Sequence, residues 1–136
     1  MRLLAGREHS RAELIAKLAR RGFDAEALER VLDNLAERGL QSDARFAEQF
    51  VATRMRRGSG PLRIRAELRQ RGIADDLVAR QLDIDPEVWL HHLRQVHERK
   101  YGGTAPSDRN DLARRIRFLE SRGFPGELIQ RLLRER

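Results

Sequence analysis

The sequence predicts an all-α fold made of tandem helical repeats, and three observations support this prediction. The pattern Leu-x-x-Arg-Gly followed by Phe or Ile occurs three times, with its glycines at Gly22, Gly72 and Gly123. Spacings of 50 and 51 residues between these glycines indicate a repeat. Ala, Leu, Arg and Glu, which favour helices, are abundant, and the 136 residues include only 4 prolines. No segment alternates apolar and polar residues as a half-buried strand would.

Each copy of the pattern predicts two helices separated by a glycine turn. A glycine after a final Leu and a basic residue ends a helix, because the first position beyond a helix usually has a positive φ. An acidic residue follows each glycine by four positions, where it suits the positive end of the next helix. Apolar residues follow by six and ten positions and share one face of that helix. These acidic and apolar residues are Glu26, Leu28 and Leu32; Asp76, Val78 and Leu82; and Glu127, Ile129 and Leu133.

Capping residues mark where the first helices begin. Ser10-x-x-Glu13 is a capping box, Asp24 and Ser42 precede the next two helices, and Arg38-Gly39 ends the second of the three. We expect the later helices over about 61–71, 75–82, 86–100, 107–122 and 125–134. The apolar residues that we expect on the buried faces of the first three helices are Leu14, Ile15, Leu18 and Ala19; Leu28, Val31, Leu32 and Leu35; and Phe46, Phe50, Val51 and Met55.

Two glycine-containing breaks divide the chain into three parts. The breaks are Gly58-Ser59-Gly60-Pro61 and the segment YGGTAP at 101–106. We predict three tandem three-helix repeats, of helix-turn-helix type, that form an elongated solenoid. The first occupies residues 1–58 and includes a helical stub at Met1–Gly6, the second occupies 59–103, and the third, truncated repeat occupies 104–136.

The charge of the chain is positive and unevenly distributed. The formal net charge is +7, and the first helix of each predicted repeat is basic while the remaining segments are acidic. Residues 54–71 contain seven arginines, with Glu67 as their only acidic residue. A basic protein of this size often binds nucleic acid or another polyanion. Stacked repeats would present their basic helices along one side.

The arginine-rich segment is the candidate binding site. Neighbouring arginines repel one another unless a polyanion or carboxylates relieve the repulsion, and phosphate or the acidic surface of a protein would both do so. The alternative is a solvated helix face whose aliphatic stems cover the core. The candidate residues, including those of the first and third basic helices, are Arg54, Arg56, Arg57, Arg63, Arg65, Arg69, Arg71, Arg114, Arg117, Lys17 and Arg21.

The sequence contains no convincing catalytic, cofactor or metal motif. His91, His92 and His97 lie on one predicted helix but lack the paired i, i+4 spacing of a helical metal site. The glycine segments lack the Lys-Ser/Thr of a phosphate-binding loop. The chain has no Cys, which excludes thiol catalysis, and no apolar run long enough for a membrane span. We therefore expect a binding protein that is not an enzyme and needs no cofactor.

Four motifs resemble those of the RecX regulatory proteins, in the right order from about Leu3 to Leu133. They are Arg7-Glu8-His9-Ser10-Arg11 with Glu13-Leu14; Gly39-Leu40-Gln41-Ser42-Asp43 with Arg45-Phe46-Ala47; Gly60-Pro61-x-Arg63-Ile64-x-x-Glu67-Leu68-x-x-Arg71-Gly72-Ile73; and Arg117-Phe118-Leu119-x-x-Arg122-Gly123-Phe124. The resemblance implies an all-helical cytoplasmic protein that binds the RecA recombinase in the groove of its filament on single-stranded DNA. It would inhibit filament extension, ATPase and strand exchange in homologous recombination, DNA repair and the SOS response. We expect it to act as a monomer and without contact to a membrane.

Two other functions stay open from the sequence. One is a stand-alone nucleic-acid-binding module of helix-turn-helix type, although the basic residues are spread over three helices instead of one recognition helix. The other is a helical-repeat adaptor that binds an acidic protein partner without DNA.

Overall fold

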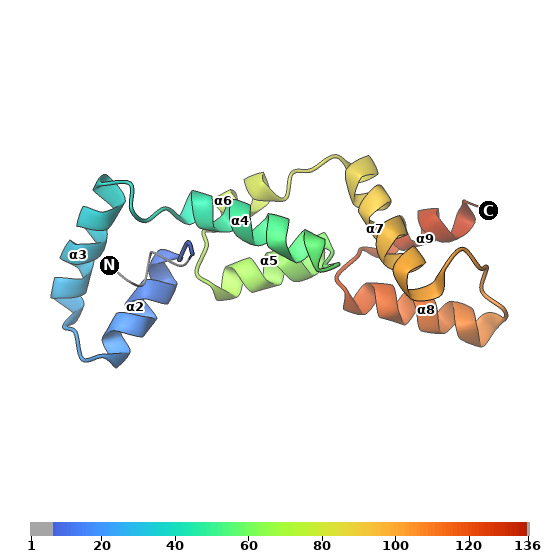
Figure 1. The fold of residues 1–136 in the computed structure, drawn as a ribbon, viewed down its shortest axis with the longest axis horizontal. Helices are drawn as coiled ribbons and strands as arrows, with labels where there is room; N and C mark the ends of the chain where they lie inside the picture. The colour runs from blue at the N-terminus through green and yellow to red at the C-terminus, as the bar shows by residue number, and fades with distance from the viewer. Residues whose placement is uncertain (1–6, 136) are drawn as a thin grey trace. The chain divides into compact units, whose positions relative to one another are not determined.

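The computed structural model describes residues 7–135 and contains eight α-helices and no strand within them (Figure 1). This confirms the predicted all-α fold. The helices are α2 (Arg11–Arg20), α3 (Ala25–Glu37), α4 (Asp43–Arg56), α5 (Pro61–Gln70), α6 (Asp75–Gln81), α7 (Pro86–Tyr101), α8 (Arg109–Ser121) and α9 (Gly126–Arg134). The stub expected at Met1–Gly6 lies outside the described residues. None of the helices in the described part of the chain is both long and apolar enough to cross a membrane.

The chain folds into two compact units. The N-terminal unit comprises Met1–Val51 and Glu67–Gln81, and the C-terminal unit comprises Ala52–Ala66 and Leu82–Arg136. Because these boundaries fall inside α4 and α5, both of these helices contribute residues to each unit. The repeat boundaries predicted at 58/59 and 103/104 stay a prediction.

The expected capping residues begin several of the helices. Ser10 and Glu13 form a complete capping box at α2: Ser10 Oγ accepts from the Glu13 N–H at 3.1 Å, and Glu13 Oε1 accepts from the Ser10 N–H at 3.0 Å. Ser42 Oγ accepts from the Arg45 N–H at 3.2 Å at the start of α4. Asp24 is the N-cap of α3, but its side chain accepts no hydrogen bond from that helix. Its backbone carbonyl accepts from the Leu28 N–H at 2.9 Å instead.

The three copies of the glycine pattern end their helices with the same hydrogen bond. In each copy, the N–H of the apolar residue after the glycine donates to the carbonyl of the Leu five positions earlier. This bond closes a Schellman turn, which places the glycine at positive φ. The donor and acceptor pairs are Phe23 to Leu18 at 3.3 Å, Ile73 to Leu68 at 3.2 Å and Phe124 to Leu119 at 3.3 Å. The repeated sequence pattern therefore corresponds to a repeated backbone turn.

The N-terminal unit buries a narrower apolar stripe than the sequence predicts. Leu14 of α2 packs in one cluster with Leu32 and Leu35 of α3. Ile15 and Val31, expected on buried faces, are 37% and 43% exposed. Two short helices cover only the side on which they meet, so residues on the flank of that side stay in solvent. Ala19 is also exposed, and Phe50 and Met55, the latter in the C-terminal unit, are only half-buried.

The C-terminal unit has its core between α7, α8 and α9. Its buried apolar residues are Ile64, Leu82, Trp89, Leu90, Leu93, Val96, Leu119, Phe124, Leu128, Ile129 and Leu132. Arg115 of α8 is also buried, at 4% exposure. Its guanidinium donates to the Thr104 carbonyl at 2.7 Å, pairs with Asp111 at 3.1 Å and lies 4.5 Å from the centroid of the Tyr101 ring. One arginine thus fastens the break at 101–106 to α8.

In each unit, the start of one helix rests against the glycine turn that ends another helix; we call this contact a glycine joint. In the N-terminal unit, α2 begins against the turn Arg71–Gly72. Ser10 Oγ donates to the Arg71 carbonyl at 2.8 Å. A Cβ atom added to Gly72 would lie 2.4 Å from the Cβ atom of Ala12. The contact therefore leaves no room for a side chain at Gly72.

The C-terminal unit contains the corresponding joint, at which α5 begins against the turn Arg122–Gly123. The Gly60 N–H donates to the Arg122 carbonyl at 2.7 Å, and the Leu62 N–H donates to the Gly123 carbonyl at 2.9 Å. A Cβ atom on Gly123 would lie 2.4 Å from the Cβ atom of Arg63. The two joints use positions 51 residues apart in the sequence, so the packing repeats with the same period as the pattern.

From the glycine joint of the C-terminal unit, we predict that Gly123→Ala destabilises the protein more than Gly22→Ala does. Both glycines have positive φ, +99° and +89°, so each alanine costs about 1–2 kcal/mol of backbone energy. Gly22 has no atom within 4 Å of an added Cβ, whereas Gly123 meets Arg63, and such overpacking costs about 1–3 kcal/mol more. Urea denaturation followed by circular dichroism measures both losses. Equal losses would show that the contact at Gly123 adjusts without cost.

Candidate functional site

The eleven candidate basic residues are distributed over both units, and each unit is described by itself. The N-terminal unit contains Lys17, Arg21, Arg69 and Arg71. The C-terminal unit contains Arg54, Arg56, Arg57, Arg63, Arg65, Arg114 and Arg117.

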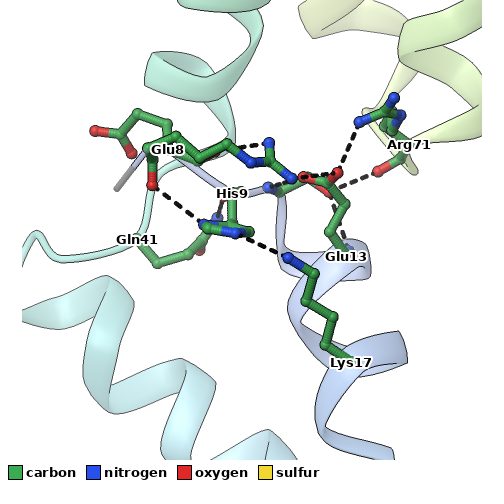
Figure 2. Close-up of polar contacts among 8 residues, drawn as sticks. Glu8, His9, Glu13, Lys17, Gln41 and Arg71 are labelled. Carbon is green, nitrogen blue, oxygen red and sulfur yellow. Dashed lines mark hydrogen bonds and ion pairs between the residues drawn. The ribbon is translucent and has the colours of Figure 1, made fainter. Parts of the chain in front are cut away.

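Arg71 is part of the glycine joint of the N-terminal unit. Its guanidinium pairs with Glu13 at 2.8 Å, and its Cζ atom lies 5.3 Å from the centroid of the Phe50 ring. Figure 2 shows Arg71 and Glu13 facing each other across the joint. The Glu13 side chain is only 13% exposed. Arg71 therefore neutralises a half-buried carboxylate, which is a structural role that the arginine-rich sequence run does not reveal.

Glu13 connects several partners at this joint. Partial burial by itself would raise the pKa of Glu13, but hydrogen bonds from the Ser10 N–H, Arg7 and Arg71 outweigh it and lower this pKa below its usual value. Glu13 therefore stays ionised and holds the start of α2, the segment before it and the end of α5 together.

Lys17 is held by a buried histidine next to the same joint. His9 is 3% exposed, with Nε2 at 3.2 Å from the Lys17 ammonium and Nδ1 at 3.1 Å from the Arg7 carbonyl (Figure 2). Because an ammonium group only donates, Nε2 accepts and Nδ1 carries the proton that is donated to Arg7. Burial, followed by the charges of Arg7 and Lys17, lowers the pKa of His9. His9 is thus a neutral acceptor that positions Lys17.

The other two candidates of the N-terminal unit are exposed. Arg69 pairs with Asp75 at 3.1 Å, and exposed pairs of this kind contribute little stability. Arg21 is the C-cap residue of α2 and makes no side-chain ion pair or hydrogen bond within residues 7–135.

Most candidates of the C-terminal unit are exposed and unengaged. Arg57, Arg65, Arg114 and Arg117 make no side-chain hydrogen bond, and no ion pair within 4 Å, to any described residue. Arg56 donates to the Thr53 hydroxyl at 3.2 Å. Arg54 is half-buried, and the Cβ atom of Arg63 lies at the glycine joint. The structure therefore separates the arginines that pack from those that project into solvent.

The structure adds three cations that the sequence analysis missed. Arg99, Lys100 and Arg122, together with Arg57, line a hollow of about 250 Å³ in the C-terminal unit, which we call the basic hollow. Its other lining residues are Gly58, Val96 and Phe118. Arg99 and Lys100 were not among the predicted binding residues because they belong to a stretch with a net negative charge. Arg122 was not among them because it is part of the turn pattern. The one sequence signal was the adjacent basic pair at the end of a helix, next to the break at 101–106.

The three histidines of α7 have separate surroundings. His91 is exposed, while His92 is half-buried and lies 3.1 Å from the Ser59 carbonyl and 5.6 Å from the Phe124 ring centroid. His97 is buried, with Nε2 at 3.3 Å from the guanidinium of Arg115. Burial lowers the pKa of His92. In the part of the chain that the structure describes, no three His, Asp or Glu residues gather as metal ligands would.

Comparisons with known proteins agree on one family. Models of the first, second and third three-helix domains of RecX match residues 1–35, 42–82 and 90–133. Regulatory protein RecX of Halorhodospira halophila (strain DSM 244 / SL1) is 50% identical over 96% of this chain and 81% of its own length. Regulatory protein RecX of Ectopseudomonas mendocina (strain ymp) is 49% identical over 98% of this chain and 89% of its own length.

Solved structures show the same fold. The crystal structure of RecX from Lactobacillus salivarius matches with a TM-score of 0.84 and 22% identity, over 98% of this chain and 89% of that chain. A second crystal structure, of a regulatory protein RecX, matches with a TM-score of 0.83 and 23% identity, over 96% of this chain and 67% of that chain. The all-α fold with three three-helix domains is therefore confirmed.

From the glycine joint of the N-terminal unit, we predict that Arg71→Gln destabilises the protein and that Arg65→Gln does not. Loss of Arg71 leaves Glu13 with fewer hydrogen bonds in a half-buried place, at a cost of about 1–3 kcal/mol. Arg65 has no such partner among the described residues, so its replacement changes the free energy of unfolding by less than about 0.5 kcal/mol. Thermal denaturation of both variants compares these values. Similar stabilities would contradict the structural role of Arg71.

His9 predicts a loss of stability as the pH falls below about 6.5. Its pKa is lower in the folded chain than the ordinary value of 6.5, so the unfolded chain binds the proton more readily in that range. The stabilising contribution is complete above pH 6.5 and disappears as the pH falls through the folded pKa. Urea denaturation at a series of pH values gives the free energy of unfolding at each pH. Between pH 6.5 and the folded pKa, this free energy should fall less steeply with decreasing pH in His9→Gln than in the wild type. Identical slopes would contradict the buried neutral state of His9.

Proposed function

We propose that this chain, which belongs to the RecX family of regulatory proteins, regulates the RecA recombinase by binding RecA and the single-stranded DNA of its filament. Bound there, it would inhibit filament extension, ATPase and strand exchange in recombination and DNA repair. RecX is a family of regulatory proteins and not of enzymes. The chain would accordingly act by docking, as a cytoplasmic monomer, and without catalysis of its own.

One observation supports the proposed binding mode above all others. Among the candidate residues of the C-terminal unit, four are exposed and form no side-chain hydrogen bond or ion pair with a described residue: Arg57, Arg65, Arg114 and Arg117. Guanidinium groups bind phosphate and carboxylate in bidentate geometry, and a protein–DNA filament offers both. None of these four guanidinium groups forms an ion pair within 4 Å with a described carboxylate, so their charge is available to an external polyanion.

The basic residues divide into proposed contacts and supports. We place Arg54, Arg56, Arg57, Arg63, Arg65, Arg114 and Arg117 at the contact with the RecA filament, together with Arg21 and Arg69. Lys17 and Arg71 would act indirectly, because His9 and Glu13 hold them at the glycine joint.

The proposal predicts that the wild-type protein lowers the rate of ATP hydrolysis by RecA on single-stranded DNA at stoichiometric or lower ratios. The variant Arg65→Gln/Arg117→Gln should require about two- to thirty-fold more protein for the same inhibition. This range follows because each exposed ion pair contributes about 0.2–1 kcal/mol. A coupled assay of ATP hydrolysis measures the inhibition.

The matched control is Arg20→Gln/Arg38→Gln, which removes the same charge from exposed positions outside the candidate set. It should inhibit like the wild type. Absence of inhibition by the wild type would refute regulation of this activity. Equal weakening by both double variants would refute the choice of contact residues.

A further inference from the structure

The basic hollow brings together residues from four places in the C-terminal unit. Arg57 follows α4, Arg99 and Lys100 are in the last turn of α7, Phe118 is on α8, and Arg122 is the C-cap of α8. Figure 1 shows the C-terminal end of α7 close to α8, where the rings of Tyr101 and Phe118 are in contact. These residues are far apart in the sequence, so the charge that they create exists only in the folded chain.

The four cations of the basic hollow form no ion pair within 4 Å with a described residue. The residues that line it include no Asp or Glu. No residue between 7 and 135 forms an ion pair with any of the four, which are Arg57, Arg99, Lys100 and Arg122. Like charges around a hollow of about 250 Å³ repel one another, and an external anion would remove that repulsion. The residues that line the hollow therefore carry four positive charges and no negative charge.

Phe118 positions two of these cations. The Lys100 ammonium lies 4.8 Å and the Arg122 Cζ atom 5.3 Å from the centroid of the Phe118 ring. Cation–π attraction holds both groups at the hollow. Tyr101 contacts the same ring edge-on, with the ring centroids 5.9 Å apart. With these partners over it, the ring is not free to stack a nucleobase.

The glycine joint fixes the backbone of the hollow. The Arg122 carbonyl accepts from the Gly60 N–H at 2.7 Å, and a Cβ atom on Gly58 would lie 3.5 Å from Val96. The backbone next to Arg57 and at Arg122 is therefore fixed before a ligand arrives, and such preorganisation lowers the entropic cost of binding.

We propose that the basic hollow binds the phosphates of single-stranded DNA through charge, without recognising the bases. Successive phosphates of a single strand bring several negative charges close together, and this suits converging guanidinium and ammonium groups better than a single carboxylate does. The aromatic ring at the hollow, Phe118, is already in contact with Lys100, Arg122 and Tyr101, which does not favour the stacking by which other single-strand binders hold bases. The choice of DNA as the source of the phosphate rests on the function proposed above.

The test measures binding of the full chain to fluorescently labelled oligo(dT) and oligo(dA), without RecA, by anisotropy between about 50 and 200 mM salt. Each phosphate contact on a single strand contributes about −0.7 to the slope of log K against log salt concentration. The variant Arg99→Gln/Lys100→Gln should therefore reduce the magnitude of the slope by about 1.4, and equally on both oligonucleotides. Both positions are exposed, and circular dichroism checks that the helices are retained.

The control Arg20→Gln/Arg38→Gln has the same net charge as Arg99→Gln/Lys100→Gln. It should keep the wild-type slope of log K against log salt concentration. An equal reduction in the control would overturn the proposal, because net charge alone would then explain binding. An unchanged slope in Arg99→Gln/Lys100→Gln, or no binding of the oligonucleotides by the wild type, would also overturn it. So would displacement of the oligonucleotide by polyglutamate as readily as by unlabelled DNA, since the site would then suit an acidic polypeptide.

The RecA assay in parallel separates this proposal from the regulatory one. Inhibition of ATP hydrolysis by the wild type, with an unchanged slope in Arg99→Gln/Lys100→Gln, would overturn the proposal for the basic hollow alone. The opposite result is a slope that changes as expected in Arg99→Gln/Lys100→Gln while the wild type does not inhibit ATP hydrolysis by RecA. This result would support the phosphate site and refute the regulatory function.

Discussion

The close approach of a helix start to a glycine turn is the constraint on which both units depend. At Gly72 and Gly123, a Cβ atom would lie 2.4 Å from the Cβ atom of Ala12 or Arg63. Only glycine permits this approach and also adopts the positive φ that ends the preceding helix. The same residue therefore ends one helix and receives the start of another that lies earlier in the chain, so the sequence repeat becomes a packing repeat.

The two joints differ in what surrounds them, and this difference assigns separate tasks to similar arginines. At the first joint, Arg71 neutralises Glu13, and His9 holds Lys17 beside them. At the second joint, backbone N–H groups make the hydrogen bonds, and the guanidinium of Arg122 is left to line the basic hollow. A basic residue that satisfies a carboxylate stabilises the fold, whereas one without a partner contributes a surface charge that an external anion can use.

These assignments are consistent with a protein that regulates by occupying a surface. The basic hollow and four unengaged candidate arginines belong to the C-terminal unit, whereas the N-terminal unit contains the engaged Lys17, Arg69 and Arg71 and one unengaged candidate, Arg21. The N-terminal unit also keeps Phe23 55% exposed, although the equivalent Ile73 and Phe124 are 4% and 1% exposed. Equivalent positions in the three copies thus serve different purposes even though their backbone turns are the same.

The sequence by itself determined the helices, their ends and the repeat, because these depend on hydrogen bonds between residues at most five positions apart. Ser10, Gly72 and Gly123 are examples, since each acts on its own turn of chain before any packing. Only the tertiary structure decided that Ile15 faces solvent, that Arg71 faces Glu13, and that Arg99 joins Arg122 at one hollow. Burial and charge pairing depend on which distant segments meet, and a pattern that is identical in three copies contains no information about the neighbours of each copy.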